Sequence, residues 1–151
     1  MSIKEQIDAD LKTAMLAGDK VLTTTLRGLK AAILNVEISD GKRDSGLTDE
    51  EVTSILGKEA KKRQESADMY TQGASADKAA AEMLEKQVIE KYLPTQVDDE
   101  ALKNLVEAAI TETGAASMQD MGKVIGLVKS RAGATADGGR IAGMIKERLS
   151  A

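Results

Sequence analysis

The side chains that could do chemistry in this sequence are mainly basic ones gathered near its C-terminal end. Residues 114–151 hold six basic and three acidic residues, a net charge of +3, whereas the rest of the 151-residue chain carries −7. Such an asymmetry can mark an interaction surface, and cations are the groups that meet the phosphates of a nucleic acid. The candidate phosphate-contacting residues are Lys123, Lys129, Arg131, Arg140 and Lys146.

These five cations could bind one nucleic acid only if the fold gathers them on one face. Lys123 and Lys129 are six residues apart, as are Arg140 and Lys146, so helical spacing supports a shared face only in part. The alternative is an ordinary solvated surface. The net charge of the whole chain, −4, also argues weakly against a dedicated nucleic-acid binder.

A glycine-rich segment, residues 133–140, separates two of these basic stretches. A glycine-rich turn that enters a helix offers free backbone N–H groups, which can hold a phosphate. The segment lacks the Gly-Lys-Ser/Thr ending of a P-loop, and Asp137 is placed to occupy those donors as an N-cap. We therefore interpret the segment as a helix end, a loop and a helix start.

Two further basic sets lie earlier in the chain. Arg27 interrupts an apolar helix stripe, and an ion pair with Asp10 or Glu90 is its favoured interpretation, because the guanidinium fork suits carboxylates. The segment Lys61–Ser66, with Tyr70, could contact RNA by charge and stacking. Neighbouring acidic residues favour a solvated helix with local ion pairs instead.

Groups suited to catalysis are scarce. The chain has no cysteine and no histidine, so it lacks a thiol nucleophile and the side chain best matched to proton transfer near neutral pH. The adjacent carboxylates Glu50 and Glu51 point about 100° apart on a helix, which makes a poor metal pair. Ser66 and Lys62 are four apart, but nothing in the sequence desolvates Lys62 to make it a base. We expect no catalytic residue, no metal site and no cofactor.

The sequence shows no sign of insertion into a membrane. No apolar run approaches the roughly 20 residues that a membrane-spanning helix needs. The first residues, Met1–Glu5, contain no hydrophobic core of a signal peptide. We therefore expect a cytoplasmic protein without a membrane partner.

Seven amphipathic helices must position these side chains, because apolar residues recur three and four apart and no strand-like alternation of useful length is present. Within the third helix, residues 58–68 are nearly all polar, so this part is either solvated or needs a partner helix. The predicted helices lie between Ser2 and Gly18, Asp19 and Asp40, Thr48 and Gly73, Ala76 and Tyr92, Asp98 and Gly114, Ser117 and Gly133, and from Asp137 onward.

The apolar stripes of these helices predict the core, and they include Met15 in the first helix and Leu84 in the fourth. Pro94, the single proline, ends the fourth helix, because a residue before proline is pushed out of the helical region. We predict an all-α fold in two domains. Residues 1–94 form an N-terminal region of about four helices, and residues 95–151 form a small three-helix bundle.

Four segments, in this order and spacing, resemble the GatB/YqeY family. The segments are Thr25–Ile38, Lys62–Ser66 followed by Tyr70, Glu90–Pro94, and Asp120–Gly126 followed by Ala136–Gly138. Together they cover nearly the whole chain. The resemblance implies an all-α N-terminal region followed by a three-helix tail. In the B subunit of the aspartyl/glutamyl-tRNA amidotransferase a similar tail helps to grip tRNA, while a separate cradle domain does the chemistry; nothing in this sequence matches that cradle.

We therefore expect a non-catalytic accessory protein. Its basic C-terminal module would bind tRNA, or proteins of a tRNA-aminoacylation or amidotransferase complex. Two alternatives stay open: a glutamine-dependent carbon–nitrogen ligase, the activity that the family label suggests, and a helical protein–protein adaptor.

Overall fold

The computed structural model describes residues 1–150, and within them the chain is entirely helical, without a strand. The predicted all-α fold class is therefore confirmed. The chain divides into two compact units, Met1–Leu93 and Pro94–Ala151, which we describe separately. None of the described helices combines the length and the apolarity needed to cross a membrane.

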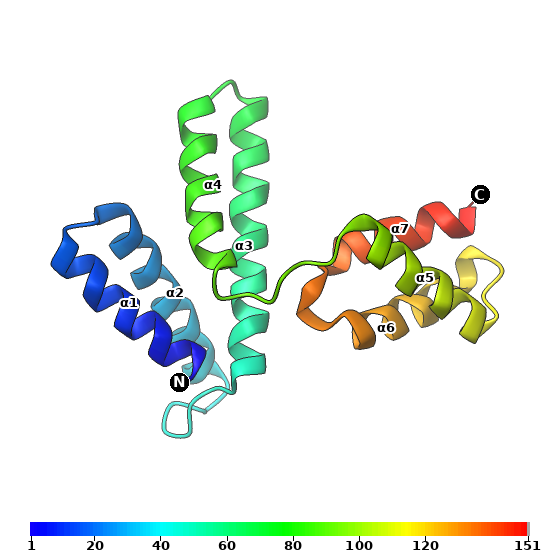
Figure 1. Cartoon of the computed structure of the whole chain (residues 1–151), viewed down its shortest axis with the longest axis horizontal. Helices are drawn as coiled ribbons and strands as arrows, with labels where there is room; N and C mark the ends of the chain where they lie inside the picture. Colours follow the sequence, from blue (N-terminus) through cyan, green and yellow to red (C-terminus); the bar gives the residue numbers. More distant parts are fainter. Residues whose placement is uncertain (151) are drawn as a thin grey trace. The chain divides into compact units, whose positions relative to one another are not determined.

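The first unit consists of two helical hairpins (Figure 1). In the first hairpin, α1 and α2 meet at Gly18, whose φ of 71° allows a tight left-handed turn. In the second, α3 and α4 pack along each other. The four helices are α1 (Ile3–Ala17), α2 (Lys20–Ser39), α3 (Asp49–Gln72) and α4 (Ala76–Glu90).

Capping boxes fix where two of these helices begin. The Ser2 hydroxyl accepts from the Glu5 N–H, and the Glu5 carboxylate accepts from the Ser2 N–H at 2.7 Å. Thr48 and Glu51 form the same reciprocal pair at the start of α3. Both boxes follow from a Ser or Thr placed three residues before a Glu, because each depends only on side chains and backbone groups three residues apart.

The polar half of α3 has a partner helix, which resolves the alternative left open by its sequence. The Arg63 guanidinium of α3 contacts Glu85 of α4 at 3.3 Å, and the Lys86 ammonium of α4 donates to the Gln64 side chain of α3 at 2.8 Å. Polar pairs and buried alanines thus hold this hairpin together where bulky apolar residues are few.

Two predicted core positions are wrong. Met15 is 52% exposed, and Ala14, its neighbour in sequence, is buried in its place. Leu84 is also 52% exposed, because α4 turns Ala79 and Ile89 inward instead. The fourth helix also ends at Glu90 rather than at Tyr92, and a tighter turn, with the Tyr92 N–H bonded to the Ile89 carbonyl, leads to Pro94.

A charged residue takes a place in the core of the first unit. Glu37 of α2 is only 2% exposed, and its carboxylate accepts a hydrogen bond of 2.6 Å from the Lys4 ammonium of α1. Glu37 follows Ile33 by four residues, so helical periodicity extends the buried stripe of α2 to it. The pair joins the two helices of the first hairpin.

The second unit is a three-helix bundle with one aliphatic core (Figure 1). Asp98 and Asp137 accept from backbone N–H groups at the starts of the first and last helices, as predicted. Gly114 ends the first helix with a left-handed φ of 67°. The helices are α5 (Asp99–Thr113), α6 (Met121–Ala132) and α7 (Gly138–Ser150), with the short 3-10 turns η1 (Met118–Asp120) and η2 (Gly133–Thr135) around α6.

The expectation of a basic C-terminal module is wrong for the unit as it folds. Residues 114–151 are basic, but α5 packs into the same core, and residues 98–112 contribute five acidic residues and one basic residue. The whole unit therefore holds seven basic and eight acidic residues, a net charge of −1. Any anion-binding surface on it must come from the separation of charges within the bundle.

Candidate nucleic-acid interface

The arginines of the second unit point toward α5. The Arg131 guanidinium of α6 donates to the Glu112 carboxylate, and Arg140 of α7 donates to Asp99 at 2.9 Å. The second arginine of α7, Arg148, donates to Glu107 at 2.5 Å. These pairs are partly or largely exposed, so each adds little to stability, but they occupy the guanidinium groups and fix their direction.

The lysines of α6 and α7 point the other way. Residues two apart on a helix project about 160° apart. Because Arg131 contacts α5, Lys129 lies on the far side of α6, and because Arg148 contacts α5, Lys146 lies on the far side of α7. Both lysines are exposed, and neither has an Asp or Glu carboxylate within 4.0 Å among residues 1–150. We call the surface formed by Lys129 and Lys146 the lysine face.

Lys129 lies across the start of α7. A Cβ at position 138 would lie 3.0 Å from its Cε and 3.1 Å from its Nζ, so the glycine lets this side chain lie closer to α7 than another residue would. The contact brings Lys129 to the end of α7 from which Arg140 projects. Sequence spacing gives no sign of this role of Gly138, since Lys129 and Gly138 lie in different helices.

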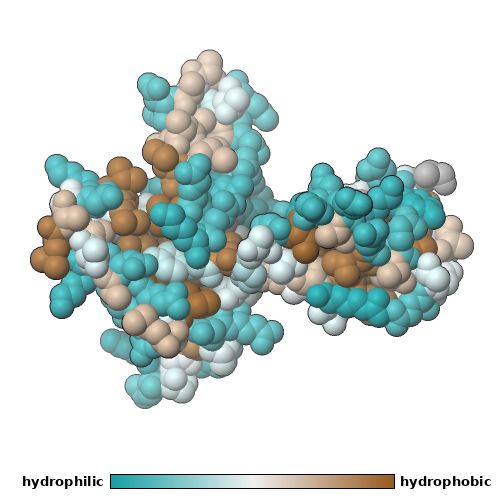
Figure 2. All heavy atoms as spheres, viewed as in Figure 1, coloured by the Kyte–Doolittle hydropathy of each residue, from teal (hydrophilic) through white to brown (hydrophobic). Residues whose placement is uncertain are grey.

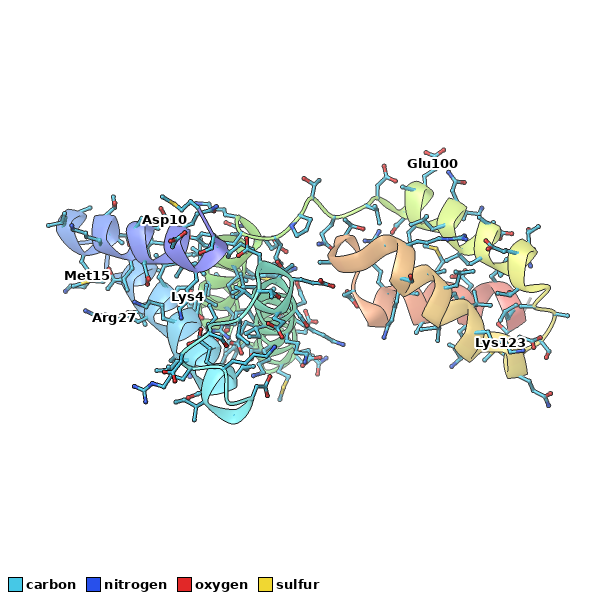
Figure 3. All side chains as sticks on the ribbon, turned by 90° about the horizontal axis from the view of Figure 1, so that it is seen from below. Lys4, Asp10, Met15, Arg27, Glu100 and Lys123 are labelled. Atoms are coloured by element: carbon cyan, nitrogen blue, oxygen red, sulfur yellow. The ribbon has the colours of Figure 1, made fainter. Side chains whose placement is uncertain are left out.

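Lys123 is a third exposed lysine of α6 and α7. It is near the start of α6, about 120° around the helix from Lys129, and points away from the core (Figure 3). Asp120 lies one turn earlier and accepts from the Ala116 and Ser117 N–H groups, which lowers the pKa of its carboxyl. Of the five predicted cations, Arg131 and Arg140 thus pair with carboxylates of α5, whereas Lys123, Lys129 and Lys146 are exposed and have no Asp or Glu carboxylate within 4.0 Å among residues 1–150.

The glycine-rich segment 133–140 serves as a connection between helices. Gly133 ends α6, η2 follows, and Asp137 accepts from the Arg140 N–H at 2.9 Å as an N-cap. A carboxylate therefore occupies the position that a bound phosphate would need. This geometry agrees with the structural interpretation of the segment.

Arg27, the first of the two earlier basic sets, has no Asp or Glu carboxylate within 4.0 Å among residues 1–150. Arg27 pairs with neither of its expected partners: Tyr92 donates to Asp10, Glu90 pairs with Lys86 at 3.4 Å, and the nearest acceptor of Arg27 is the Met15 sulfur at 3.8 Å. That expectation is wrong because α2 turns Arg27 toward solvent. The partners of Asp10 and Arg27 lie in other helices, so spacing along the sequence does not predict them.

The segment Lys61–Ser66 forms ion pairs rather than a free basic patch. Lys62 and Arg63 both pair with Glu59, at 3.1 and 2.5 Å. The Tyr70 ring has the Lys78 ammonium 5.7 Å from its centre, so one of its faces is already covered. This favours the solvated helix with local ion pairs.

Two clefts of the first unit hold charged groups that already have partners. A cleft of about 470 Å³ between α2 and α3 includes Glu51, which pairs with Lys42, and Glu59, which pairs with Lys62. A cleft of about 280 Å³ between α1 and α2 is bordered by the Lys4–Glu37 and Lys30–Asp8 pairs. Within residues 1–150 no group of three acidic side chains is close enough to hold a metal ion.

Comparison with known proteins gives one family. A family model described as Yqey-like protein matches residues 4–149. Two fungal proteins, each named "Altered inheritance of mitochondria protein 41, mitochondrial", are similar to the chain. The one from Clavispora lusitaniae is 34% identical over 69% of this chain and 61% of its own length, and the one from Eremothecium gossypii is 39% identical over 56% and 45%. The chain thus matches about half the length of these relatives.

Proposed function

This chain belongs to the Yqey-like protein family, and we propose that it is a non-catalytic accessory protein that binds tRNA through the lysine face of its C-terminal unit. The RNA could be bound alone or together with proteins of a tRNA-aminoacylation or amidotransferase complex. One observation carries the proposal: the arginines of this unit are paired with α5, whereas Lys129 and Lys146 stay exposed and without carboxylate partners among residues 1–150.

The separation of the two kinds of cation supports a phosphate surface in a unit of net charge −1. Acidic α5 is neutralised by the arginines, so its carboxylates repel an approaching RNA less than the net charge implies. Lysine ammonium groups act as mobile point charges toward phosphates. Binding of this kind releases counterions and carries little sequence preference.

Titration of the full chain against tRNA at several salt concentrations tests the proposal. The double variant Lys129→Gln/Lys146→Gln should weaken binding, and the slope of log affinity against log salt should become shallower by about 2. Lys103→Gln is the control for the loss of one positive charge. Lys103 is an exposed lysine of acidic α5, and its substitution leaves the lysine face unchanged. Absence of affinity for tRNA at low salt would sink the proposal, as would an equal loss with Lys103→Gln.

The ligase alternative requires a nucleophile or an acid–base pair. The one Ser–Lys pair suggested by the sequence does not form a hydrogen bond, since the Lys62 ammonium pairs with Glu59. Ammonia released from glutamine by the purified chain, or amidation of a mischarged tRNA, would favour the ligase over the accessory role.

Capture of partners with and without RNase distinguishes the adaptor alternative from binding through RNA. A protein that stays bound after RNase treatment favours an adaptor, and one that is lost favours binding through RNA. A cytoplasmic location remains part of the proposal. The two fungal relatives are named as mitochondrial proteins, so microscopy of the tagged chain in its own cell decides this point.

A further inference from the structure

Apolar side chains stand out from the end of the first hairpin, where α1 turns into α2. Leu16 is 82% exposed, Val21 is 55% exposed and Met15 is 52% exposed, all within three residues of Gly18. Figure 2 shows hydrophobic residues at the surface of this end of the hairpin. A cluster of exposed large apolar side chains often marks a site that binds a protein or a membrane, whereas single exposed apolar side chains are common.

The same end of the hairpin is basic, although the chain as a whole is acidic. Residues 11–36 contain four basic residues and one acidic residue, a net charge of +3 in a chain of −4. The acidic one, Asp19, accepts from the Leu22 N–H as the N-cap of α2. The cations that stay exposed, without an Asp or Glu carboxylate within 4.0 Å among residues 1–150, are Lys12, Lys20 and Arg27.

The cations flank the apolar side chains on both helices. Lys12 lies one helical turn before Leu16, and Lys20 directly precedes Val21. Arg27 lies beside Met15, with its Nη2 3.8 Å from the sulfur, and Figure 3 shows the two side chains next to each other. We call the six residues Lys12, Met15, Leu16, Lys20, Val21 and Arg27 the hairpin tip.

We infer that the hairpin tip binds the surface of an anionic lipid membrane. The turn between two helices is convex, so it offers a flat partner an apolar point rather than a groove for a helix. Leu16, Val21 and Met15 would enter the boundary between headgroups and acyl chains. The stems of the cations would lie along the same boundary, with their charged ends at the lipid phosphates.

Charge and apolar exposure together favour lipid over RNA. A phosphate backbone would meet the three cations but would leave Leu16 and its neighbours without gain. The nearest acidic residue on α1 before the tip, Asp10, lies about 9 Å from Leu16 along the helix, close to one Debye length at physiological salt. Residues 12–27 keep a net charge of +2 with Asp19 included, so the tip itself attracts an anionic surface.

This inference departs from the sequence-based expectation of no membrane partner. That expectation rested on the missing apolar run, whereas a peripheral contact needs only a few exposed apolar side chains and cations. It concerns the first unit, so it stands apart from tRNA binding by the lysine face.

Vesicle flotation of the full chain tests the inference. The protein should float with vesicles of phosphatidylglycerol and not with vesicles of phosphatidylcholine, and salt should weaken the binding. Leu16→Ser should reduce the partition constant by about tenfold, since a nearly fully exposed leucine loses its burial in the membrane. The triple variant Lys12→Gln/Lys20→Gln/Arg27→Gln should lose about fivefold for each charge.

Matched variants elsewhere on the first unit serve as controls. Leu84→Ser removes an equally apolar exposed side chain from α4, and Lys58→Gln/Lys61→Gln/Lys91→Gln removes three exposed cations outside the tip. Both should float as the parent does, and circular dichroism should show that all variants remain folded.

Three outcomes would overturn the inference. One is equal flotation with both lipids, and another is an equal loss in the control variants. The third is a tip variant that keeps its vesicle binding while losing tRNA, since the cations would then belong to an RNA surface. Flotation that depends on phosphatidylglycerol and on both classes of tip residue supports it.

Discussion

The Lys4 ammonium of α1 donates a hydrogen bond of 2.6 Å to the carboxylate of Glu37 in α2, and Glu37 is only 2% exposed. Lys30 forms a pair of the same length with Asp8, and both lysines are 42% exposed. The two ion pairs join the same two helices. They differ mainly in burial, because Asp8 is 47% exposed.

This difference gives a matched prediction for the free energy of unfolding. Lys4→Met should cost about 2 kcal/mol, because it leaves a buried carboxylate without its partner. Lys30→Met should cost less than about 1 kcal/mol, since water replaces the lysine. Urea denaturation of the two variants measures both values. Equal costs would contradict the argument, and adding Glu37→Leu to Lys4→Met should restore most of the loss.

Tyr92 should make the stability of the fold decrease at high pH. Its hydroxyl donates to Asp10, and burial together with this neighbouring carboxylate raises the pKa of Tyr92 well above its ordinary value of 10.0. A raised pKa means that the folded state holds the proton more tightly, so this contribution is complete below pH 10 and is lost as pH rises above it.

The parent protein should therefore lose stability above pH 10 more steeply than Tyr92→Phe does. Thermal unfolding of both proteins across the alkaline range measures the difference, which removes the common effect of lysine titration. The same slope in the two proteins would show that Tyr92 does not carry the effect.

Glu51 should act at the opposite end of the pH scale. Hydrogen bonds from the Lys42 ammonium and the Thr48 N–H lower the pKa of its carboxyl below 4.5. Because the folded state favours the ionised carboxylate, Glu51 contributes stability that is fully present above pH 4.5. This contribution is lost as pH falls through the lowered pKa. Glu51→Gln should therefore flatten the loss of thermal stability below pH 4.5, and Glu50→Gln, at an exposed neighbour, should not. An unchanged acid profile in Glu51→Gln would refute this role.

Gly138 should matter for binding more than for stability. Gly138→Ala brings a methyl group within 3.0 Å of the Lys129 side chain, whose end must then shift away from the start of α7 by a few tenths of an ångström. The displaced atoms are the end of a flexible side chain, so the melting temperature should change little or rise slightly. If the lysine face binds tRNA, affinity should fall severalfold. Gly143→Ala is the control in the same helix, because nothing lies within 4 Å of its added methyl group.

Helix starts and stops could be predicted from the sequence with good accuracy. The helix starts at Ser2, Thr48, Asp98 and Asp137 and the helix ends at Gly18 and Gly114 all appear in the structure as expected. Each depends on groups within four residues of one another. Such local interactions are nearly independent of how the helices later pack.

The candidate site could not be predicted in the same way. Five cations were identified by type, but spacing within one helix gave no sign that Arg131 reaches Glu112, or that Arg140 and Arg148 reach residues 41 positions earlier. The acidic composition of residues 98–112 was the available signal. It went unused because these residues lie outside the segment that was counted as basic.

The sequence by itself determined that the chain is helical, where most helices begin and end, and which residue types could meet an anion. Only the tertiary structure decided which of these groups are free. Helix packing turned Met15 outward and Glu37 inward, and it set the arginines of the second unit against α5 while leaving its lysines exposed. The physical reason is that capping is decided within one helical turn, whereas burial and ion pairing depend on rotations of whole helices against distant partners.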